Sequence, residues 1–467
     1  MLLFTLQQAG AIARIASGFA SISSDHRVQT ILIGFFLTAF LTGVAGFGTP
    51  AAIVAPLLVS LGFPALAAVV VALVGHAIAT TYGAVGVPIS PGIADAVGSL
   101  ETVSAGEAAV FAGDVSGLAA TDHVLPGLAM PLVTVSMLVY FFGDVLPFTL
   151  TAVFLGPELP SIIAPIVGGG LTVGVLNRGW LLPDDQWHLP ADHTWPENWT
   201  GSPPENHADQ PTGQQHTVTD GGQPLSLGRA WTPYFLLVVL LIGTRDFTPV
   251  GSALTRLDMF TLSWTGIFDT TLTNSIAWAY APGTWLVATA LIAIPLYGLS
   301  GTEIKHAWQE AGETTIAPAV ALTFIIGTVG ILLHSGQYGG APGSQSMMLA
   351  IADGVGETFG GVYTAVVAPI GVVGTFVTGS VMVSNVTFSP MQYELAGELG
   401  YNQAHVVAAQ AAAGGIGNAI SIHNVIAALA TVGLMGKEGT VIRMNMLPVA
   451  AYTLIILMLL STASLFV

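Results

Sequence analysis

Charge is what this sequence has least of: only 7% of its 467 residues are charged, whereas 53% are hydrophobic. A soluble domain typically carries about a quarter charged residues, which cover its water-facing surface. With a mean hydropathy of +0.75, most of the exterior must face lipid instead. The composition therefore excludes a soluble protein. It predicts a multi-pass protein of the cell membrane that is surrounded by the lipid bilayer.

Basic residues are scarce and cysteine is missing. The sequence has 9 Lys and Arg against 26 Asp and Glu, and no Cys. Nucleic acid is not expected as a partner, because phosphate binding needs clusters of Lys and Arg. The missing Cys excludes disulfides, thiolate metal sites and Cys nucleophiles. Acidic, lysine-poor loops favour a halophilic archaeon as the source, and an ordinary acidic extramembrane loop is the alternative explanation.

Motifs of catalysis are missing as well. The sequence has no HExxH metal motif and no GxSxG elbow, and Glu438 stands where a P-loop would need Ser or Thr. We therefore expect no enzyme, no metal and no cofactor, and direct ATP-driven pumping is disfavoured. A passive channel is the alternative to a transporter. Accumulation of the substrate against its gradient would distinguish them, because a channel cannot perform it.

What the sequence does contain is a series of apolar stretches, and a membrane-crossing helix needs about 20 such residues. About eleven stretches are found, some short enough to be half-spans, which predicts an all-α polytopic membrane protein. Residues 177–230 form a polar, acidic loop that we expect outside the membrane. This loop divides the chain into an N-terminal membrane half, 1–176, and a C-terminal membrane half, 231–467.

Helix-breaking residues gather in four apolar segments, two in each half: 43–56, 76–89, 374–390 and 414–425. Gly and Pro interrupt a helix and free backbone groups that lipid cannot satisfy, so such breaks persist where they line a cavity. A helix that begins inside the membrane presents bare N–H groups and a positive dipole end to an anion. Interrupted segments at matching places in two halves indicate a transporter site. Close packing of small residues is the alternative for any single segment.

Several runs of residues, inside these segments and outside them, resemble the L-lactate permease family. The resemblance is carried by the following runs: Gly43–Pro56, Tyr82–Ile89, Leu150–Ser161, Trp231–Tyr234, Gly379–Asn385 and Thr431–Gly439. It spans nearly the whole chain except residues 184–228. It implies uptake of lactate, and of glycolate, coupled to a cation that is usually a proton. It also implies two inverted-topology repeats with discontinuous helices and re-entrant hairpins. A homo-oligomer is possible, and the sequence does not decide the oligomeric state.

The sequence departs from the family pattern in two respects. Family members usually carry one or two apolar spans before the segment equivalent to Leu6–Ser24, so we expect the N-terminus to be truncated relative to the family. Many relatives have Lys where Asn418 stands, and another residue where His423 stands. Sodium coupling and another small carboxylate as substrate therefore remain alternatives. A dicarboxylate would call for more fixed positive charge in the membrane than this sequence offers.

A 2-hydroxy monocarboxylate is ionised at neutral pH, and an uncharged cradle of hydroxyls, amides and helix ends suits it. The candidate substrate-binding residues are Gly48, Thr49, Ser380, Ser384, Asn385, Asn418 and Ser421. Packing or helix capping is the alternative role for each of them.

Three ionisable residues are candidates for proton coupling, because such residues at membrane depth are functional candidates by default. Glu158 lies between Gly and Pro residues inside an apolar stretch, and a hairpin tip facing water is its alternative role. His76 and His423 lie in two of the interrupted segments and could titrate near neutral pH. A hydrogen-bonded core histidine is the alternative for each.

Overall fold

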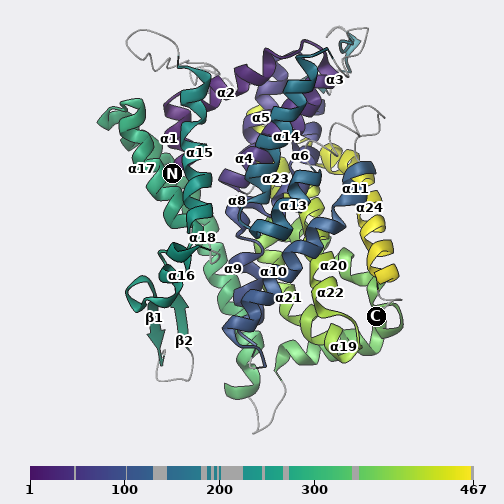
Figure 1. Cartoon of the computed structure of the whole chain (residues 1–467). Helices are drawn as coiled ribbons and strands as arrows, with labels where there is room; N and C mark the ends of the chain where they lie inside the picture. Colours follow the sequence, from purple (N-terminus) through teal and green to yellow (C-terminus); the bar gives the residue numbers. More distant parts are fainter. Residues whose placement is uncertain are drawn as a thin grey trace. The chain divides into compact units, whose positions relative to one another are not determined.

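The computed structural model describes residues 1–46, 49–100, 102–129, 145–179, 187–190, 194–196, 199–200, 225–244, 248–266, 273–338 and 346–463. Helices dominate this part of the chain (Figure 1). The prediction of an all-α polytopic membrane protein is confirmed, with one small two-stranded hairpin as an addition. The chain divides into two compact units, formed by residues 1–18 with 213–316 and by residues 19–212 with 317–467. The arrangement as inverted repeats with re-entrant hairpins remains a prediction.

The first unit is a set of helices with a short hairpin. Its elements are α1 (Leu2–Gln8), most of α2 (Ala11–Ala20), α15 (Leu227–Gly243), α16 (Pro249–Arg256), η6 (Asp258–Phe260), β1 (Leu262–Thr265), β2 (Thr273–Ile276), α17 (Pro282–Tyr297) and the first part of α18 (Gly301–Tyr338). Helix α17 packs against both α1 and α15. The strands pair antiparallel, with Leu262 opposite Ile276. Arg229 ties α15 to α17 by donating to the backbone oxygen of Leu296 over 2.6 Å.

The second unit contains the four interrupted segments. Its elements are α3 (His26–Gln29), the π-helix η1 (Thr30–Leu37), α4 (Thr38–Ala45), α5 (Thr49–Ser60), α6 (Ala65–Gly75), α7 (Ala77–Thr80), α8 (Gly83–Gly86), α9 (Ser90–Gly98), α10 (Ala105–Asp122), α11 (Val124–Ala129), α13 (Leu146–Leu155), α14 (Pro160–Leu176), the rest of α18, α19 (Met347–Phe359), η8 (Gly360–Val362), α20 (Thr364–Thr378), α21 (Val381–Glu398), α22 (Gln403–Gly417), η9 (Asn418–Ile420), α23 (Ile422–Thr431) and α24 (Glu438–Ala463).

Four helical stretches among the described residues are long and apolar enough to cross a membrane: His26–Val44, Pro160–Asn177, Gln403–Thr431 and Glu438–Ala463. A fifth span is bent by 45° between its two parts, Ala65–Gly75 and Ala77–Gly86. Shorter apolar helices, such as α13, α15, α17 and α20, coincide with other apolar stretches of the sequence. With 10–17 residues, they are shorter than a typical crossing helix of about 20 residues.

Glycine allows the helices of the second unit to approach one another closely. A Cβ added at Gly75 on α6 would lie 1.8 Å from the backbone oxygen of Gly34 on η1. A Cβ added at Gly371 on α20 would lie 2.3 Å from the backbone oxygen of Gln410 on α22. Such contacts between small residues are how membrane helices pack without a hydrophobic driving force. The second unit is therefore held together by backbone proximity as well as by side chains.

A helix ends and another begins within each of the four interrupted segments. Helix α4 ends before Gly46, which has a φ of +74°, and α5 begins at Thr49. The span containing α6 and α7 bends at His76. Helix α20 ends before Gly379, whose φ is +75°, and the break between α22 and α23 extends from Asn418 to Ser421. The residues of the break from Asn418 to Ser421 are buried.

Candidate substrate site at the helix breaks

Two helices of the C-terminal half begin next to each other at Gly379. Helix α21 is capped by Ser380, whose Oγ accepts from the Val383 N–H over 3.3 Å. Helix α23 is capped by Ser421, whose Oγ accepts from the Asn424 N–H over 3.4 Å. A Cβ added at Gly379 would lie 3.6 Å from the Ser421 Oγ, so the two helix starts are neighbours. Two positive dipole ends therefore meet at one place, which favours an anion.

A buried network of one imidazole and two amides lies at the break between α22 and α23. His76 Nε2 is 2.9 Å from Asn418 Oδ1, which also accepts from Asn424 Nδ2. His76 Nδ1 is 3.0 Å from the backbone oxygen of Ala72. All three side chains have 0% exposure, and Asn418 Nδ2 and Asn424 Oδ1 have no hydrogen-bond partner. An unpaired polar atom in a low-dielectric interior costs free energy, so these atoms suggest a bound polar group.

A second set of buried amides lies further along α21. Asn385 Nδ2 donates over 2.9 Å to the backbone oxygen of Pro88, in the segment just before α9. Asn385 Oδ1 accepts from Gln410 Nε2 over 3.2 Å. The Ser384 Oγ donates over 3.3 Å to the backbone oxygen of Gly371. These contacts join α20, α21 and α22 to the N-terminal half of the chain.

The structure thus brings together five of the seven predicted substrate residues, in two groups on neighbouring helices. Ser380, Ser384 and Asn385 lie along the start of α21, and Asn418 and Ser421 lie at the break before α23. Gly48 lies outside the described residues. Thr49 begins α5, and its side chain is also outside the described part. The contacts of Ser380 and Ser421 are those of helix caps, and a substrate role for all seven residues remains a prediction.

The three predicted proton-coupling residues occupy different surroundings. His76 belongs to the amide network, whereas His423 is exposed on the first turn of α23. A Cβ at Gly379 would lie 3.0 Å from the His423 Cβ, so this histidine flanks the paired helix starts. Glu158 is buried just before α14, where its Cα would be 2.8 Å from a Cβ at Gly86. Their roles in coupling remain predictions.

Sequence reasoning missed several buried polar residues that the structure adds to this region. Asn424 completes the network around Asn418, and Asn445 on α24 donates over 2.7 Å to the backbone oxygen of Ala419 within the break. His123 lies between two hydroxyls, with Nε2 2.9 Å from Thr81 Oγ1 and Nδ1 on the Tyr452 hydroxyl. Each of these residues lies in a largely apolar part of the sequence: Asn424 follows His423, His123 follows Asp122, and Asn445 comes two residues after Arg443. Only their polarity within such stretches could have singled them out.

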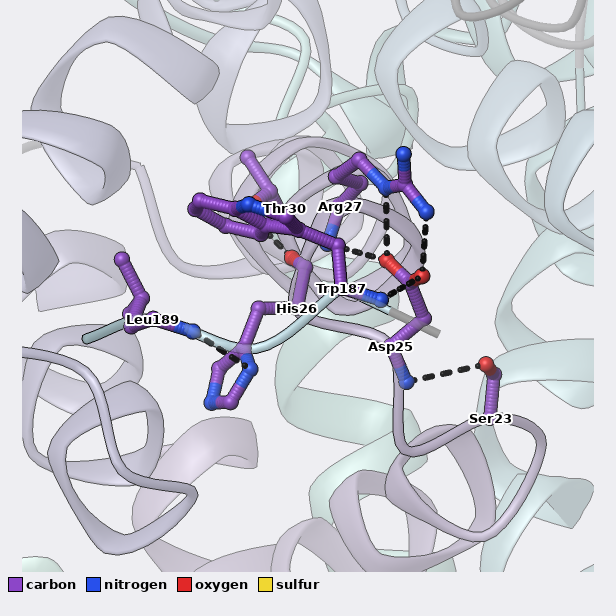
Figure 2. A network of polar contacts seen from close by, with 7 residues as sticks. All are labelled: Ser23, Asp25, His26, Arg27, Thr30, Trp187 and Leu189. Carbon is purple, nitrogen blue, oxygen red and sulfur yellow. Dashed lines mark hydrogen bonds and ion pairs between the residues drawn. The ribbon is translucent and has the colours of Figure 1, made fainter. Parts of the chain in front are cut away.

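A further polar network ties a loop to the start of the first long span (Figure 2). Asp25 caps α3 by accepting from the Arg27 N–H over 2.8 Å, and it pairs with the Arg27 guanidinium. Its Oδ2 also accepts from the backbone N–H of Trp187 over 2.8 Å. The backbone N–H of Leu189 lies 3.4 Å from His26 Nδ1. Trp187 and Leu189 are therefore fastened to the start of the span His26–Val44.

The charge of Asp25 persists under physiological conditions. Burial acts to raise the pKa of this carboxyl. The hydrogen bonds from Arg27 and from the backbone N–H of Trp187 outweigh burial, and they hold the pKa well below its usual range. A lowered pKa means that the stabilisation is present at neutral pH and is lost only as the pH falls through the lowered value. The contacts of the Asp25 carboxylate are consequently kept throughout the neutral pH range.

Apolar helices that are interrupted inside the bundle, with buried polar groups at the breaks, are typical of membrane transporters. Among the described residues, no group of three His, Asp or Glu side chains could hold a metal ion. The sequence pattern of the family described as L-lactate permease matches residues 2–466. The chain therefore belongs to the L-lactate permease family, as its motifs predicted. It is a multi-pass protein of the cell membrane and a permease, not an enzyme.

Individual relatives agree with this assignment. A putative L-lactate permease of Haemophilus influenzae is 27% identical over 96% of this chain and 82% of its own length. The L-lactate permease of Bacillus subtilis is 27% identical over 92% of this chain and 77% of its own length. A glycolate permease of Escherichia coli is 26% identical over 92% and 76%. No solved structure matches the chain.

Proposed function

We propose that this protein is a secondary active transporter that imports lactate, and also glycolate, coupled to the entry of protons. The observation that carries the proposal is the uncharged buried site formed by Asn418, Asn424 and the paired starts of α21 and α23. Relatives named for L-lactate and for glycolate supply the substrate class. Both substrates are small 2-hydroxy carboxylates, and they differ by one methyl group.

The chemistry of the site suits a single negative charge. Helix N-termini and amide N–H groups offer positive partial charge to a carboxylate without a fixed cation. A fixed cation would hold the anion tightly, and release on the other side would then be slow. Ser380, Ser384, Asn385, Asn418, Ser421, Gly48 and Thr49 are the residues that we assign to the substrate. The proton would be carried by His76, with Glu158 and His423 as further candidates.

Uptake of labelled L-lactate into proteoliposomes tests this proposal. We expect concentrative uptake when the outside is more acidic than the inside, and loss of accumulation when a protonophore collapses that gradient. An imposed sodium gradient alone should give only equilibration. Unlabelled glycolate should compete with L-lactate, whereas a dicarboxylate such as succinate should not. Accumulation driven by sodium but not by protons would refute proton coupling, and no uptake under any gradient would refute lactate as the substrate.

A further inference from the structure

The side chains of His76, Asn418 and Asn424 can form two alternative hydrogen-bonding arrangements, here called settings, which differ by one proton on His76. The Nδ1 of His76 faces the backbone oxygen of Ala72, which can only accept, so Nδ1 carries a hydrogen in both settings. The Nε2 faces Asn418. Whether Nε2 also carries a hydrogen decides which end of the Asn418 amide must face it, because an amide oxygen accepts and an amide nitrogen donates.

In the first setting His76 is protonated. Its Nε2–H donates to Asn418 Oδ1, and the same oxygen accepts from Asn424 Nδ2. Two atoms are then left without a partner: Asn418 Nδ2, a donor, and Asn424 Oδ1, an acceptor. The oxygen and nitrogen atoms of the two amides are placed in this way in the structure.

In the second setting His76 is neutral, and both amides are turned by about half a rotation. Asn418 Nδ2 then donates to His76 Nε2 and to Asn424 Oδ1, and its own Oδ1 takes the unpaired outer position. The shape of the network hardly changes, since the oxygen and nitrogen of an amide are nearly alike in size. What changes is the hydrogen-bonding character of the two unpaired atoms: that of Asn418 is now an acceptor, and that of Asn424 is now a donor.

We propose that protonation of His76 switches the two unpaired amide atoms of Asn418 and Asn424 between donor and acceptor, so that they fit a 2-hydroxy carboxylate. With His76 protonated, the Asn418 N–H groups donate to the substrate carboxylate and the Asn424 oxygen accepts from its 2-hydroxyl. With His76 neutral, the Asn418 oxygen repels the carboxylate. The inference rests on the proposed function and gives its coupling a physical cause: proton and substrate each favour the same setting, so each strengthens the binding of the other.

The position of the network agrees with this role. Asn424 is fully buried and follows Ile422 and His423, which are exposed at the start of α23. The switch therefore requires that the substrate reach the buried pair from this end of α23. Other titratable and charged side chains on the elements packed around His76 are His405 on α22, His423 on α23, Glu438, Arg443 and Tyr452 on α24, Glu158 before α14 and Tyr82 before α8. Because Ala72 and Asn418 take both ring nitrogens of His76, none of these groups bonds to it directly.

Proton uptake on ligand binding tests the switch without requiring transport. Purified full-length protein in weakly buffered detergent solution near neutral pH, with a pH-indicator dye, should take up protons when L-lactate is added. In His76→Gln the glutamine amide can either donate to Asn418 or accept from it, and neither requires a change of protonation. We expect this variant to bind lactate, to exchange internal for external lactate in proteoliposomes, and to show no lactate-dependent proton uptake or acid-driven accumulation. His405→Gln, on α22 and 13 residues before Asn418, should behave as the unmodified protein.

A second variant covers the case in which His76→Gln does not fold. In Asn424→Asp the side chain has nearly the same shape but can only accept, so it holds Asn418 in the setting that presents an oxygen. We expect lactate affinity to fall at least about tenfold, the loss expected from one unfavourable polar contact. In the unmodified protein, propionate, which lacks the 2-hydroxyl, should bind more weakly than lactate by a similar factor.

The outcomes separate the switch from the proposed function. Proton-coupled uptake in the unmodified protein with unchanged proton uptake in His76→Gln would overturn the switch and leave the transporter proposal standing. Unchanged lactate affinity in Asn424→Asp, or equal binding of propionate and lactate, would also overturn it. Failure of the unmodified protein to take up lactate under any gradient would overturn the proposed function itself, and the switch with it.

Discussion

Replacement of Gly379 by alanine should reduce L-lactate uptake at least about tenfold. Gly379 ends α20 with a φ of +75° and separates the starts of α21 and α23. An alanine Cβ would lie 3.0 Å from the His423 Cβ, so His423 at the start of α23 would have to give way by a few tenths of an ångström. The left-handed conformation adds roughly 1–2 kcal/mol of strain. If the carboxylate binds where the two helices begin, this displacement weakens its binding directly.

Gly400 provides a matched control for this substitution. It has the same φ of +75°, and nothing lies within 4 Å of its added Cβ. Gly400→Ala should therefore carry the backbone strain alone and keep uptake within about twofold of the unmodified protein, since surface changes have small effects. Uptake rates would be compared in proteoliposomes at equal amounts of inserted protein. Equal loss in both variants would show that strain, and not the spacing of α21 and α23, controls transport.

The second prediction of a large effect concerns the close contact of α6 with η1, which belongs to the span His26–Val44. Gly75→Ala should destabilise the protein by about 3 kcal/mol or more, because its Cβ would lie 1.8 Å from the Gly34 backbone oxygen. A backbone atom cannot rotate away as a side chain can, so η1 and α6 must separate. Because His76 follows Gly75 directly, the amide network would be displaced as well. The midpoint of thermal unfolding in detergent would measure the effect.

Gly113 on α10 is the control, because no atom lies within 4 Å of its added Cβ. In an open helical position, alanine is favoured over glycine by up to about 1 kcal/mol. Gly113→Ala should therefore leave the unfolding midpoint unchanged or raise it slightly. A Gly75→Ala protein that unfolds at the same temperature as Gly113→Ala would contradict the close contact of η1 with α6.

The sequence was a good guide to where the backbone would be interrupted. Gly46 and Gly379 adopt positive φ, a conformation that glycine tolerates best, and both lie in segments where breaks were expected. Ser380 and Ser421 stand where helices begin, as hydroxyl caps do. Local preferences of this kind depend on a few neighbouring residues, so they can be recognised before the fold is known.

The partners of the polar side chains could not be predicted in the same way. His76 and Asn418 are 342 residues apart, and no local pattern connects them. Asn424 and Asn445 are asparagines in largely apolar helices. Such residues look the same in a sequence whether they bind a ligand or bond to a backbone group. The fastening of Trp187 to Asp25 depends on how a loop returns to a span. These pairings follow from the packing of whole helices.

The most direct test of the substrate site is protection of a single cysteine by L-lactate. The natural sequence has no Cys, so one introduced thiol reports its own surroundings without background. Ile422→Cys places it on the first residue of α23, a position 46% exposed, and Met435→Cys places a control beyond the end of α23 at 58% exposure. We expect lactate to slow maleimide labelling several-fold at Ile422→Cys and to leave Met435→Cys unchanged. Unchanged labelling of Ile422→Cys at lactate concentrations that saturate uptake would contradict a substrate site at the paired starts of α21 and α23.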